Sequence, residues 1–295
     1  MRETITKQAQ NVLLLRKLAA ERAYNEKMQP LFETTEYQEL NKKLTKLLIA
    51  NARAESLGEK PNKTLEKELS SQMENLKRSA GLANVKIAYT CPLCRDEGFV
   101  DGQMCKCLKT EISKILLQES GFDKLESFDS SMQTSGDLAK HYALMEEWCN
   151  KNSEKTLIYL SGPTGVGKTH LVRCMANELI ANGKIVKLVT AFNMNQDFRE
   201  FSKTNNDEIL NKYTTPEVLV IDDLGTEPKY DGVTIELLYL VINERKVKKL
   251  PTIITSNLDL ADIRDTYDER IYSRIVDRQT SINLLLNGAD RRVQK

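Results

Sequence analysis

Apolar residues recur every three or four positions over roughly the first eighty residues, which is the spacing of helices with one apolar face. The pattern predicts a first helix that ends at a break at residues 28–30. A second helix is expected between Thr35, as its capping residue, and Gly58. A third follows Pro61 and ends near Gly81. The apolar positions that define these faces are Ile5, Val12, Leu15 and Leu18, then Leu40, Leu44 and Leu47, then Leu65, Leu69, Met73 and Leu76.

An apolar helix face has to be covered, and the sequence leaves two ways of covering it open. Either the helices pack on one another as a bundle or hairpin, or a face is kept for a partner protein. Aromatic residues are few in this part of the chain, so an isolated deep core is not expected. We interpret residues 1–84 as a helical, partner-binding region.

From residue 137 onward the hydrophobic pattern changes. A helix carrying Leu138, Tyr142, Met145 and Trp148 on its core side comes first. Short apolar runs at 157–160, 185–190 and 217–222 then alternate with helical stretches, and another run follows at 252–257. This alternation predicts an α/β fold with a parallel sheet.

The composition of the segments between these patterns predicts where one domain ends and the next begins. A connector rich in Ser, Asp and Gly marks a break near residue 130. We therefore expect a cysteine module over 85–112, a linker over 113–136 and the α/β domain over 137–295.

Composition narrows the class of protein. The 295 residues are 40% hydrophobic and 29% charged, as in a globular domain, and the net charge is +1. Such a balance gives no overall attraction to DNA or an anionic membrane, so any nucleic-acid contact needs a local patch. The start, MRETITKQAQ, has no signal pattern and no apolar run is long enough to span a bilayer. We expect a cytoplasmic protein without a membrane partner, in which structural disulfides are rare.

The stretch CPLCRDEGFVDGQMCKC, residues 91–107, holds four of the six cysteines. Cys91 and Cys94 have C-x2-C spacing, and Cys105 and Cys107 are two apart, which directs both to one side of an extended segment. Four thiolates complete a closed tetrahedral zinc site, which would be structural rather than catalytic. An iron–sulfur cluster, disulfides and free thiols remain alternatives. The other two, Cys149 and Cys174, fall in helical patterns and are expected to be small buried residues.

Residues 162–169, GPTGVGKT, match the phosphate-binding loop G-x-x-x-x-G-K-T between a strand and a helix. Gly165 and Gly167 allow backbone N–H groups to turn toward phosphates, and the helix that follows directs its positive end at them. Lys168 is expected to reach the β- and γ-phosphates, and the hydroxyl of Thr169 to bind Mg²⁺. The predicted ATP-binding residues of this loop are Gly162, Pro163, Thr164, Gly165, Val166, Gly167, Lys168, Thr169 and His170.

Two further strands end in polar residues. The run VLVIDD places Asp222 at the carboxyl end of a buried strand, where it would hold Mg²⁺. Asp223 would polarise the attacking water, or else serve as a turn or capping carboxylate. Asn257, at the end of TIITSN, fits a position that orients this water or senses the γ-phosphate.

Taken in order, GPTGVGKTHL, VIDDLG, ITSNL and DERIYSRI resemble the helicase-loader branch of the AAA+ ATPases. That branch includes the DnaC and DnaI loaders and the related IstB-type transposition ATPases, and DnaI-like loaders carry a similar C-P-x-C-x-D-x-G element. The resemblance implies an AAA+ P-loop fold, weak ATP hydrolysis and self-association through the ATP sites. Arg274 matches the arginine finger that enters a neighbouring subunit's site, and Arg292 matches a sensor arginine.

Two predictions about partners accompany this resemblance. Arg270, Arg274 and Arg278 recur every four residues, which places like charges on one helix face and indicates an anionic partner. In the loaders the N-terminal arm grips the replicative helicase and the ATPase reads single-stranded DNA. The residues expected at a DNA-facing helix are Phe192, Phe198, Arg199, Phe201 and Lys203, although core packing of the phenylalanines is the alternative. An IstB-like transposition-assisting ATPase and a small-molecule kinase are the competing functions.

Overall fold

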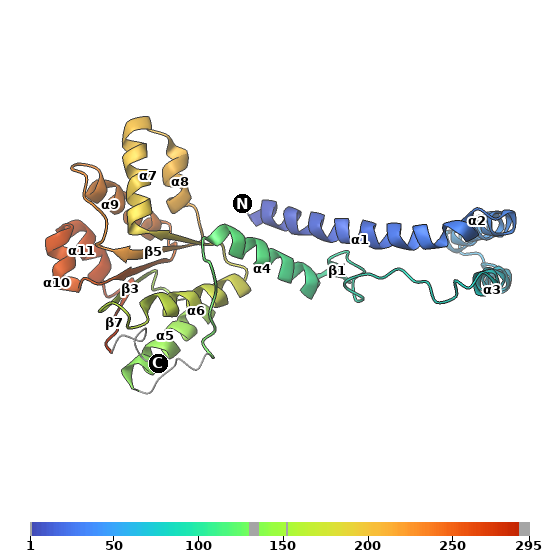
Figure 1. Ribbon diagram of the computed structural model, residues 1–295, viewed down its shortest axis with the longest axis horizontal. Helices are drawn as coiled ribbons and strands as arrows, with labels where there is room; N and C mark the ends of the chain where they lie inside the picture. The colour runs from blue at the N-terminus through green and yellow to red at the C-terminus, as the bar shows by residue number, and fades with distance from the viewer. Residues whose placement is uncertain (1, 130–135, 152, 289–295) are drawn as a thin grey trace. The chain divides into compact units, whose positions relative to one another are not determined.

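A computed structural model describes residues 2–129, 136–151 and 153–288 of the chain (Figure 1). The chain divides into two compact units. One consists of Lys7–Leu108; the other combines the N-terminal residues up to Thr6 with the chain from Lys109 onward. None of the helices in the described ranges has the length and apolarity needed to cross a membrane.

In the first unit, α2 (Thr35–Ser56) and α3 (Lys63–Ser79) form a helical hairpin. Leu40 of α2 is buried against Leu69 and Met73 of α3, and Leu44, Leu47 and Leu76 pack at the edges of this small core. For these two helices the intramolecular alternative is therefore confirmed. The capping residue of α2 is Thr34 rather than Thr35, since its Oγ1 accepts a hydrogen bond from the amide of Tyr37.

The first helix, α1 (Arg2–Phe32), differs from the expectation in two ways. It continues through Pro30, so the predicted break at 28–30 is wrong; Met28 and Leu31 are buried on either side and hold the last turn in place. Leu13, which was not among the predicted apolar positions, is also buried. Of the predicted face, Ile5 is buried, whereas Leu15 and Leu18 are 68% and 48% exposed, so the alternative of a face kept for a partner stays open for this helix.

Leu13 lies next to Gly98 of the cysteine module. A Cβ at Gly98 would lie 3.2 Å from Leu13 and 3.1 Å from Leu108, and the φ of 83° at this position also favours glycine. β1 (Phe99–Val100) and β2 (Gln103–Met104) form a short antiparallel pair within the module. Cys105 follows β2, but Cys107 lies in the first turn of α4 (Lys106–Ser120), so the extended segment predicted for this pair is wrong.

The second unit contains a five-stranded parallel sheet in the order β4-β5-β6-β3-β7. The strands are β3 (Leu157–Ser161), β4 (Val186–Thr190), β5 (Val218–Leu224), β6 (Thr252–Ser256) and β7 (Ser281–Leu285). The strand before the phosphate loop, β3, lies between β6 and β7, so the loop emerges from the interior of the sheet. The predicted α/β fold class with a parallel sheet is confirmed.

Helices cover both faces of this sheet, because neighbouring strand residues point to opposite sides. Ile158 and Val220 pack with α5 (Asp137–Asn150) and α6 (Lys168–Ala181). Tyr159 and Ile221 pack on the other face, against α7, α9, α10 and α11. The bounds of the remaining helices are α7 (Ala191–Thr204), α8 (Asp207–Thr214), α9 (Thr234–Val247), α10 (Leu260–Thr266) and α11 (Glu269–Val276).

Several side chains occupy the core as expected. Tyr142, Met145 and Trp148 of α5 are buried, and so are Cys149 and Cys174. The segment assigned to a linker, 113–136, is different: it begins inside α4, and Leu116, Phe122 and Phe128 lie in the same core. These apolar residues make the described part of that segment a part of the hydrophobic core of the second unit.

Candidate functional site

The phosphate loop connects β3 to α6 through glycines in conformations that other residues rarely adopt. Gly162, Gly165 and Gly167 have φ angles of 144°, 83° and 106°. A Cβ at Gly162 would lie only 2.1 Å from the carbonyl oxygen of Leu286, next to the end of β7. Since α6 begins at Lys168, its first amide groups stand at the end of this loop, as an anion site requires.

Lys168 brings the loop together with the end of β6. Its Nζ donates to the carbonyl oxygens of Gly162 and Pro163 at 2.7 and 2.9 Å and to Oδ1 of Asn257 at 2.7 Å. The side chain is buried, so the ammonium depends on these acceptors. The predicted sensor asparagine therefore lies beside the lysine expected to bind phosphate.

The two aspartates at the end of β5 are organised by Thr255, a buried residue of the neighbouring strand β6. The Thr255 hydroxyl donates to Oδ1 of Asp222 at 2.5 Å and accepts from the amide of Asp223 at 2.9 Å. Burial raises the pKa of Asp222, while the Thr255 hydrogen bond and the charges of Lys168 and Arg173 oppose this effect. Asp223 is exposed and has a φ of 57°, which turns its side chain away from the strand direction.

These residues surround a cavity of about 490 Å³ at the carboxyl ends of the strands. Most of the predicted loop residues, His170, Asp223 and Asn257 line it, whereas the predicted residues Gly162, Pro163, Val166 and Asp222 do not. Arg173 and Thr226 also line it and were not predicted. The full lining is Thr164, Gly165, Gly167, Lys168, Thr169, His170, Arg173, Asp223, Thr226 and Asn257.

Contacts with two neighbouring side chains fix the orientation of the His170 ring. Its Nδ1 lies 2.8 Å from the hydroxyl of Tyr142 on α5, and the Sγ of Cys174 is 3.7 Å away on the next turn of α6. This contact with Tyr142 orients the ring at the edge of the cavity. One turn further along α6 than Thr169, Arg173 also contacts the carboxylate of Asp123 at 2.9 Å.

The three arginines of the stretch DERIYSRIVDR, residues 268–278, are divided between two environments. Arg270 and Arg274 lie on α11, while Arg278 follows the end of that helix at Val276, so the predicted row of three charges on one helix face is wrong. Arg270 pairs with Glu236, and Arg274 contacts Tyr239 and Asn243 of α9. Arg274 does not line the cavity of its own chain. Arg292 lies outside the described residues.

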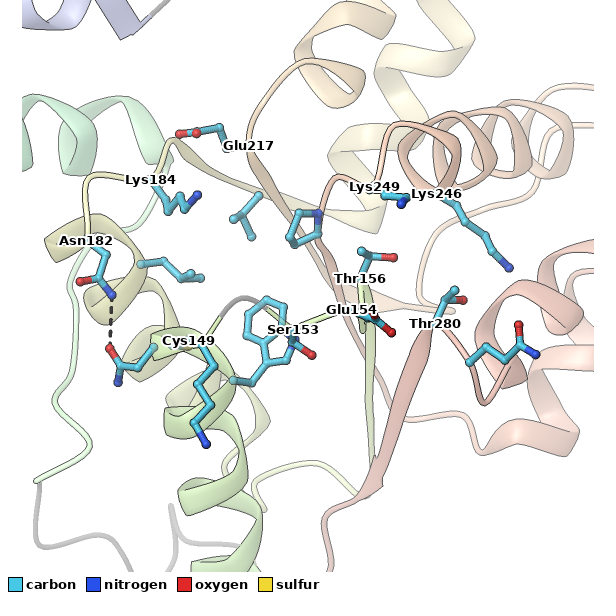
Figure 2. Close-up of a pocket in the computed structure, with 17 residues that line it drawn as sticks. Cys149, Ser153, Glu154, Thr156, Asn182, Lys184, Glu217, Lys246, Lys249 and Thr280 are labelled. Atoms are coloured by element: carbon cyan, nitrogen blue, oxygen red, sulfur yellow. Dashed lines mark hydrogen bonds between the residues drawn. The ribbon is translucent and has the colours of Figure 1, made fainter.

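A larger cavity of about 820 Å³ lies at the opposite, amino edge of the sheet (Figure 2). Thr156, Pro251 and Thr280, which precede β3, β6 and β7, form part of its wall. Asn150 and Asn182, at the carboxyl ends of α5 and α6, line it as well. Four lysines and two glutamates line this larger cavity, but no residue of the phosphate loop does. The smaller cavity, which the loop and the start of α6 line, is therefore the candidate triphosphate site.

The four module cysteines converge on one point. Their sulfur atoms all lie within 4.8 Å of one another, with Cys91 to Cys105 at 3.8 Å and Cys94 to Cys107 at 3.2 Å. Sulfurs bound at 2.3 Å to a tetrahedral zinc ion are roughly 3.8 Å apart, so the cluster fits this metal. All four are free thiols, which argues against the disulfide alternative. The metal itself, zinc or iron–sulfur, remains a prediction.

Local hydrogen bonds shape this cluster. Asp96, which is buried, accepts from the amides of Thr90 and Cys91 at 2.8 Å each and so closes the knuckle. A hydrogen bond from the backbone of Cys94 lowers the pKa of Cys91 to about 7. Burial raises the pKa of Cys107, and a bound cation would therefore be needed to keep that sulfur as a thiolate.

On α7 the phenylalanines take different positions. Phe198 is buried against Tyr213, and Phe201 packs on the same core, as the core alternative expects. Phe192 is 48% exposed. Arg199 lies over the ring of Tyr230, with 5.1 Å between its guanidinium carbon and the ring centroid. Of the expected DNA-facing aromatics, only Phe192 is thus presented to solvent to this extent.

Several known proteins are similar to this chain. The family described as IstB-like ATP binding protein matches residues 109–290. The replicative helicase loader DnaC of Escherichia coli (strain K12) is 33% identical over 121 residues, or 39% of this chain and 48% of that protein. DnaC of Buchnera aphidicola subsp. Schizaphis graminum (strain Sg) is 32% identical over 143 residues, or 46% and 55%. The chain thus spans about half the length of the curated relatives it matches.

Two solved structures are also similar to part of this chain. The crystal structure of DnaI is 26% identical and covers 56% of this chain and 90% of its own, with a TM-score of 0.45. The crystal structure of the DnaC helicase loader is 21% identical and covers 55% and 96%, with a TM-score of 0.49.

Proposed function

The chain belongs to the IstB-like ATP-binding protein family, and from this premise we propose that it is an ATPase that loads a replicative helicase onto single-stranded DNA. The observation that carries the proposal is the single cavity in which Lys168, Asp223 and Asn257 come together. The name of the curated relatives, replicative helicase loader, favours this function over the transposition-assisting ATPase and the small-molecule kinase.

The residues predicted from the sequence have the following roles in the proposed hydrolysis. Lys168 binds the β- and γ-phosphates, and the remaining loop residues with His170 enclose the nucleotide. Thr169 and Asp222 would hold Mg²⁺, which would neutralise charge on the phosphates. Asp223 polarises the attacking water and Asn257 orients it. Arg274 completes the site of a neighbouring copy, which makes hydrolysis depend on self-association. Arg292 would act as a sensor.

The helical region 1–84 is the proposed helicase-binding part. Leu14, Leu15 and Leu18 of α1 are 49%, 68% and 48% exposed, and exposed leucines on one stretch of helix are suited to a protein partner. The proposed zinc would hold the cysteine module, residues 85–112, in one fixed conformation. We place the protein in the cytoplasm.

We expect this protein to retain a replicative helicase in a pull-down, and to do so differently with ATP and with ADP. Changing Leu15 and Leu18 to serine should weaken retention at least about tenfold, because each buried leucine contributes roughly 1.5–3 kcal/mol. Val247→Ser, at an exposed apolar residue that ends α9 and lies outside residues 1–84, is the control. No retention in either nucleotide state would refute the loader function, and retention of a transposase instead would support the competing one.

Arg199 and Lys203 on α7 are proposed to contact the phosphates of single-stranded DNA. Replacing both with alanine should weaken DNA binding most at low salt. The slope of log K against log salt should fall by about 0.7 for each lost phosphate contact. Fluorescence anisotropy with a labelled oligonucleotide gives this slope, and Lys248→Ala, which breaks an ion pair with Glu244 on α9, is the control. Unchanged affinity at low salt would remove α7 from the proposed surface.

A further inference from the structure

Two residues on one side of α9, Tyr239 and Asn243, hold the guanidinium of Arg274. Its Nη2 donates to the Tyr239 hydroxyl at 3.0 Å and to Oδ1 of Asn243 at 3.0 Å, and its Nε donates to the same Oδ1 at 3.3 Å. The guanidinium carbon lies 5.2 Å from the centroid of the Tyr239 ring, within range of a cation–π interaction. Tyr239 and Asn243 are four positions apart and therefore project from the same helix face.

The hydrogen-bonding partners of Arg274 are neutral, whereas those of Arg270 are charged. Both guanidinium groups lie over the Tyr239 ring, that of Arg270 at 4.9 Å from its centroid. Arg270 pairs with Glu236 at 2.9 Å and with Asp268 at 2.8 Å. Within the part of the chain that the structure describes, no ion pair involves Arg274. A carboxylate fixes a guanidinium but compensates its charge. A hydroxyl, a ring face and an amide oxygen fix it and leave its charge available to another anion.

We propose that Tyr239 and Asn243 are positioning residues that hold Arg274 ready to enter the ATP site of a neighbouring copy. The proposal rests on the proposed function, since it requires Arg274 to act between subunits. An arginine that is already held loses less side-chain entropy when it engages the phosphates. Arg270, whose charge two carboxylates compensate, joins α11 to α9. The carbonyl of Arg274 accepts from the Ser281 hydroxyl at 3.0 Å, which ties this part of α11 to the start of β7.

Asn243→Asp tests the neutrality of this arrangement. Aspartate keeps the size and the acceptor oxygen of asparagine but adds a negative charge beside the guanidinium of Arg274. We expect kcat for ATP hydrolysis to fall at least about tenfold, a part of the roughly 10³-fold or larger effect of an arginine finger. Tyr239→Phe keeps the ring and removes the hydroxyl, so kcat should fall only about two- to threefold. The Kd for ATP should not change in either variant.

A mixing experiment separates positioning of Arg274 from a general structural defect. Subunits with Asn243→Asp have an intact ATP site, and subunits with Lys168→Ala have an intact Arg274. Mixing them should restore hydrolysis, because the second kind supplies the arginine to the site of the first. Glu244→Gln, which changes the charge by one unit at the next position of α9, is the control and should keep wild-type kcat.

The outcomes distinguish this inference from the function on which it rests. Wild-type kcat in Asn243→Asp, or no recovery on mixing while the variant still binds ATP, would overturn the positioning role and leave the ATPase function standing. A wild-type protein that binds no ATP, or wild-type kcat in Arg274→Ala, would overturn both.

Discussion

Replacing Lys168 by alanine is expected to abolish ATP binding, and with it hydrolysis. The ammonium lies among the carbonyl oxygens of Gly162 and Pro163 and the side chain of Asn257, at the point where the loop presents its amides. Hydrogen bonds to charged groups contribute roughly 1.5–3 kcal/mol each, so losing two of them to the phosphates should weaken binding by at least about 100-fold. Isothermal titration with ATP and Mg²⁺ measures this directly.

Arg274→Ala is the contrasting variant for this first prediction. Arg274 lies on α11, outside the cavity of its own chain, so the Kd for ATP should stay at the wild-type value. Hydrolysis should nevertheless fall by roughly 10³-fold or more, the effect of removing an arginine finger. An ATP affinity of Lys168→Ala equal to that of the wild type would contradict the assignment of this cavity to the triphosphate.

Removing the proposed zinc from the cysteine module is expected to unfold that module. Structural zinc contributes roughly 10–16 kcal/mol to small domains of this kind, far more than the few apolar contacts around the cluster. Cys94→Ser should therefore lose the bound metal and expose residues 85–105 to protease. Metal analysis by atomic emission and limited proteolysis are the measurements.

A matched replacement distinguishes the metal site from cysteine loss in general. Cys149→Ser also replaces a buried cysteine by serine, but Cys149 lies in α5, away from the cluster. It should keep one zinc per chain. A purified wild-type protein without zinc, and with iron instead, would favour the iron–sulfur alternative; the absence of any metal would contradict both.

The sheet and the phosphate loop could be predicted from the sequence because their signals are local. Alternation of apolar runs is sufficient to indicate parallel strands, and the glycines of the loop have few other uses at that spacing. Asn257 could be placed beside Lys168 because the carboxyl ends of parallel strands meet at one edge.

What could not be predicted depends on contacts between distant segments. Leu13, rather than Leu15, is buried because Gly98 leaves room for it, and no periodicity within α1 shows this. Arg245 is fully buried yet satisfied by Thr252 and three backbone carbonyl groups, whereas composition favours an exposed arginine. Burial lowers its pKa to about 9.

The predicted site was incomplete for the same reason. In the sequence, Thr255 has no feature that distinguishes it from other strand residues. It holds Asp222 and Asp223 only because β5 pairs with β6 in the folded chain. Arg173 lines the cavity because it follows Thr169 by one helical turn, a signal that helical spacing could have provided. The neutral partners of Arg274 come from α9, thirty or so residues away in sequence, beyond the reach of any local motif.

The central claim is that adjacent copies of this chain complete one another's ATP sites. Subunits with Lys168→Ala and subunits with Arg274→Ala should each be inactive alone, for different reasons. When the two are mixed, an intact arginine meets an intact phosphate loop at some interfaces, and the rate of ATP hydrolysis should rise well above the sum of the separate rates. A mixture no more active than that sum, although the subunits associate, would contradict the claim.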